Sequence, residues 1–358
     1  MPLALRTLEV GGSPAQMGRR HGQVLASEIR QLRRGLLAYL ARIGFYAGAL
    51  PLYALLQYLA RRFWPYLPAN LKEELVAVAA GATMGLGSIL LLNVVDDLAN
   101  NSPRCSGLAV GESHTADGVY LAGRNLDYPV FTDLLLRLQT LFLMEPHRGQ
   151  AFASLAWPGY VGVCTGMNRA GVALAQLAVM SRERTLKGVP AALGFRQALE
   201  AGATLGEVAA AVARLPGTIG NNLLLCGPGE AAVLELSPRR QAVRYPAAGL
   251  LTVTNHYQSP EMLPLQGQFP APPPFSVLSA AQFTEDYSRS RDQRLRQLAG
   301  GEDLGPEDLQ RILADERIAN AGTAVCAVFA PGARTLWVAR GEAPPVNRGP
   351  FVRVRLWA

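Results

Sequence analysis

A cysteine, an arginine and an aspartate lie within the segment 103–129, PRCSGLAVGESHTADGVYLAGRNLDYP, and this combination can support nucleophilic chemistry. Residues 106–110 and 119–124 have the character of two short strands, and Ala116-Asp117-Gly118 between them is typical of a turn. In a hairpin the start of the first strand lies beside the end of the second, so we expect Cys105 near Arg124 and Asp127. A thiol beside a guanidinium and a carboxylate, at the rim of a sheet, is a candidate nucleophile.

The same three residues also have a purely structural interpretation. A single cysteine is more often a small buried hydrophobic residue, and an Arg–Asp pair is more often a surface ion pair. The hairpin by itself leaves both interpretations open.

Composition limits the classes of protein to consider. The chain has 358 residues, of which 49% are apolar and 17% charged, enough for a sizeable core in one large or two ordinary domains. The net charge of +7 comes from scattered arginines, without a basic run interleaved with aromatic residues, so nucleic acid is not expected as a partner. The four cysteines and four histidines are widely spaced, so we expect no metal site, no cofactor and no disulfide framework.

Two segments bear on localisation. The N-terminus, MPLALRTLEVGGSP, lacks the apolar core of a secretory signal, which favours a cytoplasmic protein. Residues 44–60 are uncharged but contain Pro51 and Gln57 and are followed by Arg61 and Arg62. The segment is at the short end for spanning a bilayer, so a buried or surface-lying helix is expected.

The pattern of elements predicts an α+β fold. Residues 1–100 are expected to be helical: Ser13 caps a first helix, a second covers 36–63, a third starts at Asn70, and a short one covers 88–98. The remainder alternates runs of strands with pairs of helices. Strands are expected at 135–144, 151–157, 159–166, 172–179, 222–226, 231–236, 242–245, 250–254, 324–329, 335–339 and 351–357, and helices at 190–201, 204–215, 287–298 and 307–315. The Pro-rich stretch 258–275 is expected to be a long surface loop, a lid or a partner contact.

Five motifs in order resemble a known family. They are GGSPAQMGRRHGQVLASEIR near the start, CSGLAVGESHTADGVYLAGRNLDYP, PGYVGVCTGMNRAGVALA, LLTVTNHY, and SRSRDQRL late in the chain. In this order they resemble N-terminal-nucleophile (Ntn) hydrolases of the acyl-coenzyme A:isopenicillin-N (6-aminopenicillanic acid) acyltransferase type, which are similar to bile salt hydrolases and acid ceramidases.

The resemblance implies a four-layer αββα sandwich and a precursor that is cut immediately before Cys105. Residues 1–104 would then be a helical pro-segment and 105–358 the Ntn hydrolase domain, with the two fragments staying associated. The freed α-amino group, with a pKa of about 7.7 to 8.0, would act as base for the thiol, so no histidine is needed.

Residue roles follow from the same resemblance. Cys105 matches the nucleophile, Arg124 an arginine that holds the thiolate and the substrate carbonyl, and Asp127 the carboxylate that orients the new amino group. Asn255 matches the oxyanion donor and Arg291 an arginine that braces the cluster, although each alone could be a turn residue or a solvated helix residue. Gln176, Tyr160 and Tyr128 are expected to contact substrate. Arg104 stands where many relatives of the acyltransferase type have glycine.

The resemblance favours hydrolysis of a non-peptide N-acyl amide through a thioester on Cys105. The alternatives are transfer of the acyl group to an amine acceptor, and an unprocessed homologue that binds without catalysis. The apolar character of residues 44–63 predicts a long apolar, lipid-like acyl group or contact of this segment with a membrane surface. An ordinary buried helix is the competing interpretation of the same segment.

Overall fold

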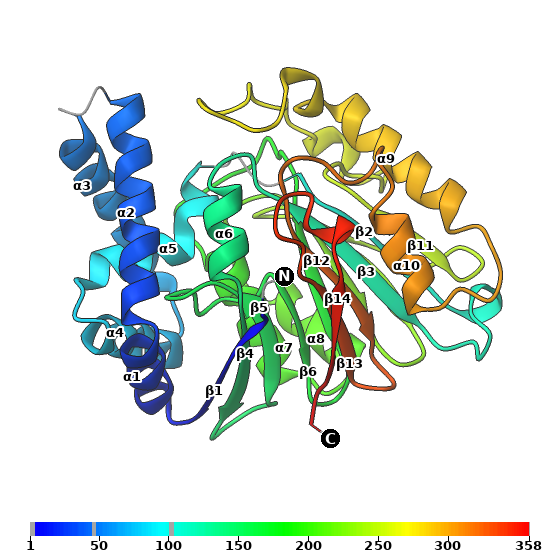
Figure 1. The fold of residues 1–358 in the computed structure, drawn as a ribbon, viewed down its shortest axis with the longest axis horizontal. Coiled ribbons are helices and arrows are strands. Elements are labelled where there is room, and N and C mark those ends of the chain that lie inside the picture. Colours follow the sequence, from blue (N-terminus) through cyan, green and yellow to red (C-terminus); the bar gives the residue numbers. More distant parts are fainter. Residues whose placement is uncertain (1–3, 45–47, 100–103, 358) are drawn as a thin grey trace.

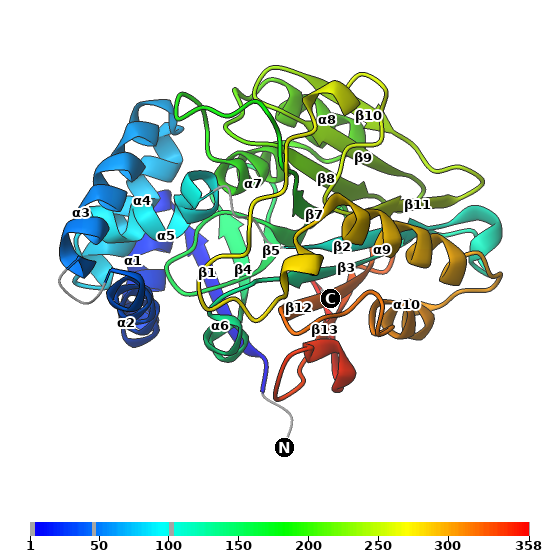
Figure 2. The ribbon, with the colours of Figure 1, turned by 90° about the horizontal axis from the view of Figure 1, so that it is seen from above.

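Two β-sheets form the centre of the molecule. The computed structural model describes residues 4–44, 48–99 and 104–357, and Figures 1 and 2 show the sheets between groups of helices. The larger sheet has the strand order β1-β4-β5-β6-β7-β8-β9-β10, in which β1 pairs parallel with β4 and the other neighbours are antiparallel. Its strands are β1 (Arg6–Gly12), β4 (Thr140–Pro146), β5 (Phe152–Ala156), β6 (Thr165–Asn168), β7 (Ala173–Ala178), β8 (Asn221–Cys226), β9 (Ala231–Leu236) and β10 (Gln241–Arg244).

The smaller sheet contains the candidate nucleophile hairpin at its centre. Its strand order is β11-β2-β3-β12-β13-β14, and all the neighbours are antiparallel. The strands are β11 (Leu250–Val253), β2 (Ser106–Val110), β3 (Leu121–Asp127), β12 (Thr323–Ala330), β13 (Thr335–Ala339) and β14 (Phe351–Arg355).

Three buried clusters join the sheets and helices. One, which includes Leu126, Leu155 and Phe329, lies between the two sheets. A second packs the outer face of the larger sheet against α7 (Ala191–Ala201), α8 (Leu205–Ala213) and the N-terminal helices. A third packs the outer face of the smaller sheet against α9 (Glu285–Leu298) and α10 (Pro306–Leu313). The fold is therefore mixed α+β with two sheets, as the sequence predicts.

The N-terminal region is mainly helical, in agreement with the sequence pattern. Its helices are α1 (Pro14–Val24), α2 (Ala26–Ile43), α3 (Ala49–Ala60), the 3-10 helix η1 (Arg61–Tyr66), α4 (Ala69–Gly81) and α5 (Leu86–Ala99). Ser13 caps α1 as expected: the Gln16 backbone N–H donates to Ser13 Oγ, and the Ser13 backbone N–H donates to Gln16 Oε1.

Several local expectations are wrong. The strand expected at 159–166 is confined to β6, which begins only at Thr165, and the helical stretch expected at 36–63 is divided among α2, α3 and η1. Residues 6–12 form strand β1 rather than helix, because they pair with β4 at the edge of the larger sheet. Asn70 does not cap the third helix, which begins one residue earlier with Pro68 at the N-cap. The segment 135–144 divides between α6 (Thr132–Leu138) and β4.

Helix α3 exposes part of its apolar surface. Leu50, Leu55 and Tyr58 are 70%, 51% and 57% exposed, whereas Tyr53 on the same helix is buried. Phe45 and Tyr46 of the predicted apolar run lie outside the described residues. Among the described helices, none has the length and hydropathy that a bilayer crossing requires. The lipid contact predicted for this segment remains a prediction.

Buried polar contacts fix the N-terminal helices to the sheets. Arg196 Nη1 of α7 donates to Glu74 Oε1 of α4 over 2.9 Å, and both side chains are 1% exposed. The backbone N–H of Gly159 donates to His21 Nε2 over 2.8 Å. Burial lowers the pKa of His21 to about 3, so its imidazole is neutral and can accept this bond.

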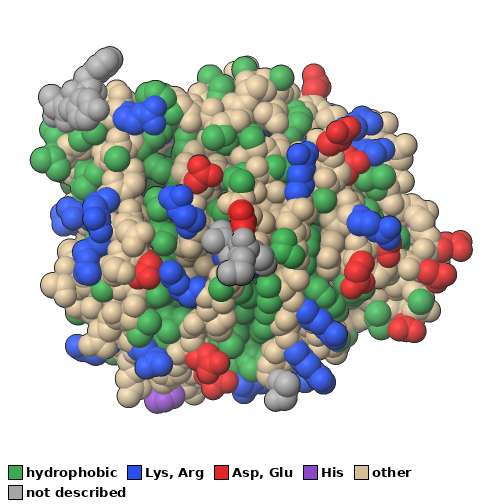
Figure 3. Space-filling view, viewed as in Figure 1, with side chains coloured by type: hydrophobic (Ala, Val, Ile, Leu, Met, Phe, Trp, Pro, Cys, Tyr) green, Lys and Arg blue, Asp and Glu red, His purple; other side chains and the backbone are tan. Residues whose placement is uncertain are grey.

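Surface charge is mixed in sign. Figure 3 shows lysine and arginine side chains interspersed with aspartate and glutamate across one face of the described residues. Basic and acidic side chains therefore share this face.

Candidate active site

The hairpin forms as predicted and brings position 105 to the end of β3. In the β2–β3 register, Ser106 is opposite Asn125 and Gly107 is opposite Arg124. One residue earlier, the backbone N–H of Arg104 donates to the carbonyl oxygen of Asp127 over 2.8 Å. Antiparallel pairing therefore continues through the residues on both sides of Cys105, and this pairing positions the thiol.

Arg124 and Asp127 extend from opposite faces of β3. Successive side chains of a strand alternate, and three residues separate these two. Arg124 shares its face with Ala122 and Leu126, which pack between the sheets. Asp127 is directed instead to the outer side, where it meets α9. The Arg124 side chain therefore reaches the Cys105 thiol on the face between the sheets, and the Asp127 side chain lies on the other face of β3.

Arg124 connects the thiol to the larger sheet. Its Nη2 donates to Cys105 Sγ over 3.3 Å and to the Gln176 carbonyl oxygen over 2.8 Å. Its Nη1 donates to Thr165 Oγ1 and to the Cys164 carbonyl oxygen. Burial raises the pKa of Cys105, and the Arg124 guanidinium opposes that rise. A fixed cation beside a buried thiol favours the thiolate, the reactive form.

Asp127 is held by three donors from distant parts of the chain. Arg291 Nη1 lies 3.0 Å and Asn320 Nδ2 lies 2.8 Å from Oδ2, and Thr323 Oγ1 donates to Oδ1 over 2.7 Å. Burial raises the pKa of Asp127, while Arg291, Thr323 and Asn320 act in the opposite direction. The carboxylate is consequently fixed in orientation beside the Arg104–Cys105 peptide bond.

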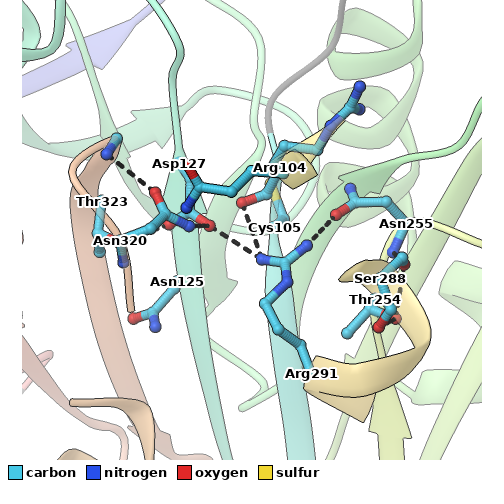
Figure 4. A network of polar contacts seen from close by, with 12 residues as sticks. Arg104, Cys105, Asn125, Asp127, Thr254, Asn255, Ser288, Arg291, Asn320 and Thr323 are labelled. Carbon is cyan, nitrogen blue, oxygen red and sulfur yellow. Dashed lines mark hydrogen bonds and ion pairs between the residues drawn. The ribbon is translucent and has the colours of Figure 1, made fainter. Parts of the chain in front are cut away.

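Arg291 contacts the peptide bond that self-cleavage would break. Figure 4 shows its guanidinium directed toward Asp127, Asn255 and the backbone of Arg104. Its Nη1 donates to the Arg104 carbonyl oxygen over 3.3 Å, and its Nη2 donates to Asn255 Oδ1 over 2.8 Å. The ring of Tyr287 lies 4.6 Å from the guanidinium carbon of Arg291. The predicted solvated alternative is wrong, because Arg291 is fully buried.

Asn255 is fixed by both its backbone and its side chain. Its backbone N–H donates to Ser288 Oγ over 2.9 Å, and its Nδ2 donates to the Ala178 carbonyl oxygen over 2.8 Å. His256 Nδ1 lies 2.9 Å from the same Ser288 hydroxyl. Burial lowers the pKa of His256 to about 4, so the imidazole is neutral at this position.

The three residues expected to contact substrate have different positions. Gln176 reaches Arg124 through its backbone carbonyl, while its side-chain Nε2 donates to Asn221 Oδ1 over 2.9 Å. Tyr128 and Tyr160 are partly buried, and each packs edge-on against Trp157, with ring centroids 5.5 Å and 6.2 Å away. Their contact with substrate remains a prediction.

Several supporting residues of the site are absent from the sequence-based prediction. Asn320 and Thr323 precede and begin β12, Thr165 begins β6, and Ser288 is on α9. They lie far from Cys105 in sequence, and only the polar turn at 320–323, directly before a predicted strand, indicates a candidate position. All four cysteines are free and buried. Within residues 4–44, 48–99 and 104–357, no group of three or more His, Cys, Asp or Glu side chains is arranged to hold a metal ion.

A sequence model described as acyl-coenzyme A:6-aminopenicillanic acid acyl-transferase matches residues 113–343, which is more than half of the chain. The chain belongs to this family. The family that the five motifs predict, an N-terminal-nucleophile hydrolase type, is therefore confirmed. Arg124, Asp127, Gln176, Asn255 and Arg291 lie within the matched range, whereas Cys105 precedes it.

Two curated proteins are similar to this chain over part of their length. An uncharacterised protein of Archaeoglobus fulgidus is 26% identical over 308 residues, covering 71% of this chain and 50% of the relative. Protein dcd1A of Dictyostelium discoideum is 26% identical over 189 residues, covering 46% of this chain and 42% of the relative. The chain spans about half the length of the curated relatives it matches or less.

Three solved structures match parts of the chain with TM-scores below 0.5. The Caenorhabditis elegans N-acylethanolamine-hydrolysing acid amidase orthologue has a TM-score of 0.48 and 19% identity, over 64% of this chain and 93% of that one. A mutant conjugated bile acid hydrolase from Clostridium perfringens has a TM-score of 0.48 and 15% identity, over 70% of this chain and 92% of that one. Penicillin V acylase from Agrobacterium tumefaciens has a TM-score of 0.45 and 14% identity, over 70% of this chain and 86% of that one.

Proposed function

We propose that this protein hydrolyses a small N-acyl amide with Cys105 as nucleophile, after cutting its own chain between Arg104 and Cys105. The observation that carries the proposal is the environment of that peptide bond. Arg124 donates to the thiol over 3.3 Å, and Arg291 donates to the carbonyl oxygen of Arg104 over 3.3 Å. One cation favours the thiolate, and the other polarises the carbonyl carbon that the thiolate would attack.

The proposed self-cleavage has two chemical steps. Cys105 Sγ attacks the carbonyl carbon of Arg104, the C–N bond breaks, and the nitrogen of Cys105 takes the thiol proton. The product is a thioester between Arg104 and Cys105 Sγ, which water hydrolyses to a carboxylate and a free thiol. The liberated α-amino group has an ordinary pKa of about 7.7 to 8.0, so it can act as base for the thiol in later turnovers.

An external amide would then follow the same course. The thiolate attacks the acyl carbon, the amine leaves with the proton, and water releases the acid from the thioester. We assign Asp127 to orienting the new α-amino group. Arg291 and Asn255 would stabilise the tetrahedral oxyanion, which forms near the position now occupied by the Arg104 carbonyl oxygen. Preorganised donors of this kind favour the transition state over the ground state.

After cleavage, fragments 1–104 and 105–358 would remain associated. Strand β1 pairs with β4, and the Glu74–Arg196 and His21–Gly159 contacts all cross the cleavage point. Separation would expose these buried groups to water and uncover the part of the larger sheet's outer face that the N-terminal helices cover. In this proposal the layers are the αββα sandwich of Ntn hydrolases, with 1–104 as an integral part of one layer.

The deciding experiment combines intact mass with an amide screen. The purified wild type should give two fragments that meet at residue 105 and should hydrolyse members of a panel of N-acyl amides. Cys105→Ala should stay a single chain and hydrolyse none. A wild type that stays uncut and inactive would mean a binding protein instead. Amide hydrolysis by an uncut wild type would refute the terminal-amine mechanism alone.

Acyl transfer is the second outcome that the screen can detect. A thioester can be attacked by an amine in place of water, so the screen includes a primary amine acceptor. Formation of the new amide at the expense of the free acid would assign the protein as an acyltransferase. A series of straight-chain acyl groups included in the screen tests the predicted lipid-like substrate.

A further inference from the structure

The side chain of Arg104 is enclosed between two phenylalanines. Its guanidinium carbon lies 4.9 Å from the ring centroid of Phe269 and 4.3 Å from that of Phe283. Arg104 is 1% exposed and Phe283 is 3% exposed, while Phe269 is partly buried. We call this site, formed by Phe269 and Phe283, the Arg104 cleft. In Figure 4 the side chain of Arg104 extends away from Arg291, while its carbonyl oxygen accepts from Arg291.

Arg104 is the acyl component of the bond that Cys105 would break first. In the cleavage step Sγ bonds to the carbonyl carbon of Arg104, so the first acyl group carried by this thiol is the arginyl group. Any later substrate must place its carbonyl carbon beside the same sulfur. The substituent on that carbon then takes the direction of Arg104 Cα and its side chain, because Arg291 fixes the carbonyl oxygen and Arg124 fixes the sulfur.

We propose that the Arg104 cleft becomes the acyl subsite of the mature enzyme once residue 104, the new C-terminus of the first fragment, has withdrawn from it, and that it selects the acyl group of a basic amino acid with a planar cation, as in arginine amides. This inference rests on the proposed function of Cys105. The faces of two aromatic rings carry partial negative charge, and a cation held against them out of water is stabilised more than at an exposed site. A neutral alkyl group would gain only from its burial.

The charge of the bound group fits this environment. Burial lowers the pKa of Arg104 to about 10, with Arg291 acting in the same direction and Cys105 and Asp127 in the opposite one. The guanidinium therefore remains protonated at neutral pH in the buried cleft. A thiolate at Cys105 would add a negative charge near the cation during turnover.

The substrate reaction balances in the same way as self-cleavage. For an Nα-acetylarginine amide, Sγ bonds to the arginyl carbonyl carbon, the C–N bond breaks, and the amine leaves with the proton from the thiol. Water then hydrolyses the thioester to Nα-acetylarginine and the free thiol. The acetyl group replaces the acyl part of the peptide bond to the Arg104 nitrogen in the uncut chain.

The test compares 4-nitroanilides that differ only in the acyl group: Nα-acetyl derivatives of arginine, lysine, norleucine and homophenylalanine, together with an octanoyl compound. We expect kcat/KM for arginine to exceed that for norleucine at least about ten-fold, the scale of one desolvated cation–π contact. The lysine substrate has a positive charge but no planar guanidinium, so its kcat/KM should lie between the values for arginine and norleucine. Phe269→Leu and Phe283→Leu should each reduce the arginine-to-norleucine ratio severalfold, with rates normalised to the cleaved fraction measured by mass.

Phe275→Leu is the matched control. Phe275 lies in the same Pro-rich stretch and stacks on a different arginine, with Arg42 3.7 Å from its ring centroid. This variant should keep the wild-type ratio. If neither cleft variant undergoes self-cleavage, the arginine-to-norleucine ratio of kcat/KM in the wild type decides whether the inference holds.

Several results would overturn the inference. These are a wild-type ratio near one, a faster octanoyl or homophenylalanyl substrate, or a ratio that both cleft variants leave unchanged. If such a result accompanies Cys105-dependent hydrolysis, only the acyl subsite is refuted and the proposed function stands. An uncut wild type that hydrolyses no amide refutes both.

Discussion

The guanidinium of Arg291 donates a hydrogen bond to the backbone carbonyl oxygen of Arg104 over 3.3 Å, although 187 residues separate the two in sequence. Arg291 comes from α9, and Arg104 directly precedes the candidate nucleophile. The same guanidinium binds Asp127 and Asn255. One buried side chain therefore connects the outer helix layer to the carbonyl, the carboxylate and the amide of the candidate site.

Replacing Arg291 by lysine should slow self-cleavage by about two orders of magnitude or more, the scale for loss of an oxyanion donor. Lysine retains the charge but cannot reach the Arg104 oxygen, Asp127 and Asn255 at once. The measurement is the uncut fraction over time by intact mass. Arg289→Lys, on the exposed side of the same helix, is the control and should cleave normally. Equal cleavage rates in the two variants would exclude Arg291 from this step.

Asp127→Asn should preserve the fold but reduce amide hydrolysis by about two orders of magnitude or more, the scale for a positioned acid–base group. The amide oxygen can take the place of Oδ2 and accept from Arg291 and Asn320, while the –NH2 group faces Thr323 Oγ1, which can accept from it. The substitution removes the charge that orients the α-amino group. The measurement is kcat at equal cleaved fraction, with Asp133→Asn as an exposed carboxylate control. Activity within a few-fold of the wild type would exclude Asp127 from the mechanism.

Arg124→Gln should move the pH dependence of Cys105 alkylation to higher pH. Burial raises the pKa of Cys105 and Arg124 opposes this, so removing the cation must raise the pKa further. At a fixed neutral pH the variant therefore holds less thiolate and should react more slowly. The measurement is iodoacetamide labelling of the Cys105 peptide across a pH series, with Arg137→Gln, an exposed arginine, as control. An unchanged midpoint would contradict a role for Arg124 in holding the thiolate.

Arg196→Met should destabilise the protein by about 3 to 5 kcal/mol, because Glu74 and Glu200 would remain buried without their cation. Arg169→Met removes the exposed pair with Glu145 and should cost about 1 kcal/mol or less. Chemical denaturation measures both. Because the Glu74–Arg196 pair joins the two proposed fragments, the first variant should also release residues 1–104 more readily from the cleaved protein. Equal costs in the two variants would contradict this account.

In the wild type, Asp97 should lower the free energy of unfolding as pH rises from about 4 to about 7, and Asp97→Asn should abolish this decrease. Burial raises the pKa of Asp97 from 3.8 to about 7. In that window the folded state binds more protons than the unfolded state, so the free energy of unfolding falls as pH rises. From pH 5 to pH 8, the free energy of unfolding of the variant should therefore rise relative to that of the wild type, by a few kcal/mol at most. Denaturation at both pH values measures the difference, and Asp117→Asn, in the exposed turn, should leave it unchanged.

The sequence by itself determined what depends on near neighbours. The hairpin follows from alternating short strands around a turn, so Cys105 could be placed beside Arg124 from spacing alone, and the β2–β3 register agrees. The Ser13 cap, the helical N-terminal region and the order of most later strands are local in the same sense. The five ordered motifs also identified the family, because each motif is read within a few residues.

Only the tertiary structure decided which groups meet at the site. Asp127 lies 164, 193 and 196 residues from Arg291, Asn320 and Thr323, and no local pattern relates them. The Arg104 cleft likewise depends on how the loop with Phe269 and the segment before α9 pack over position 104. Residues 6–12 become a strand because β4 offers an unpaired edge. Such contacts depend on sheet order and strand face, which are set when distant segments pack together.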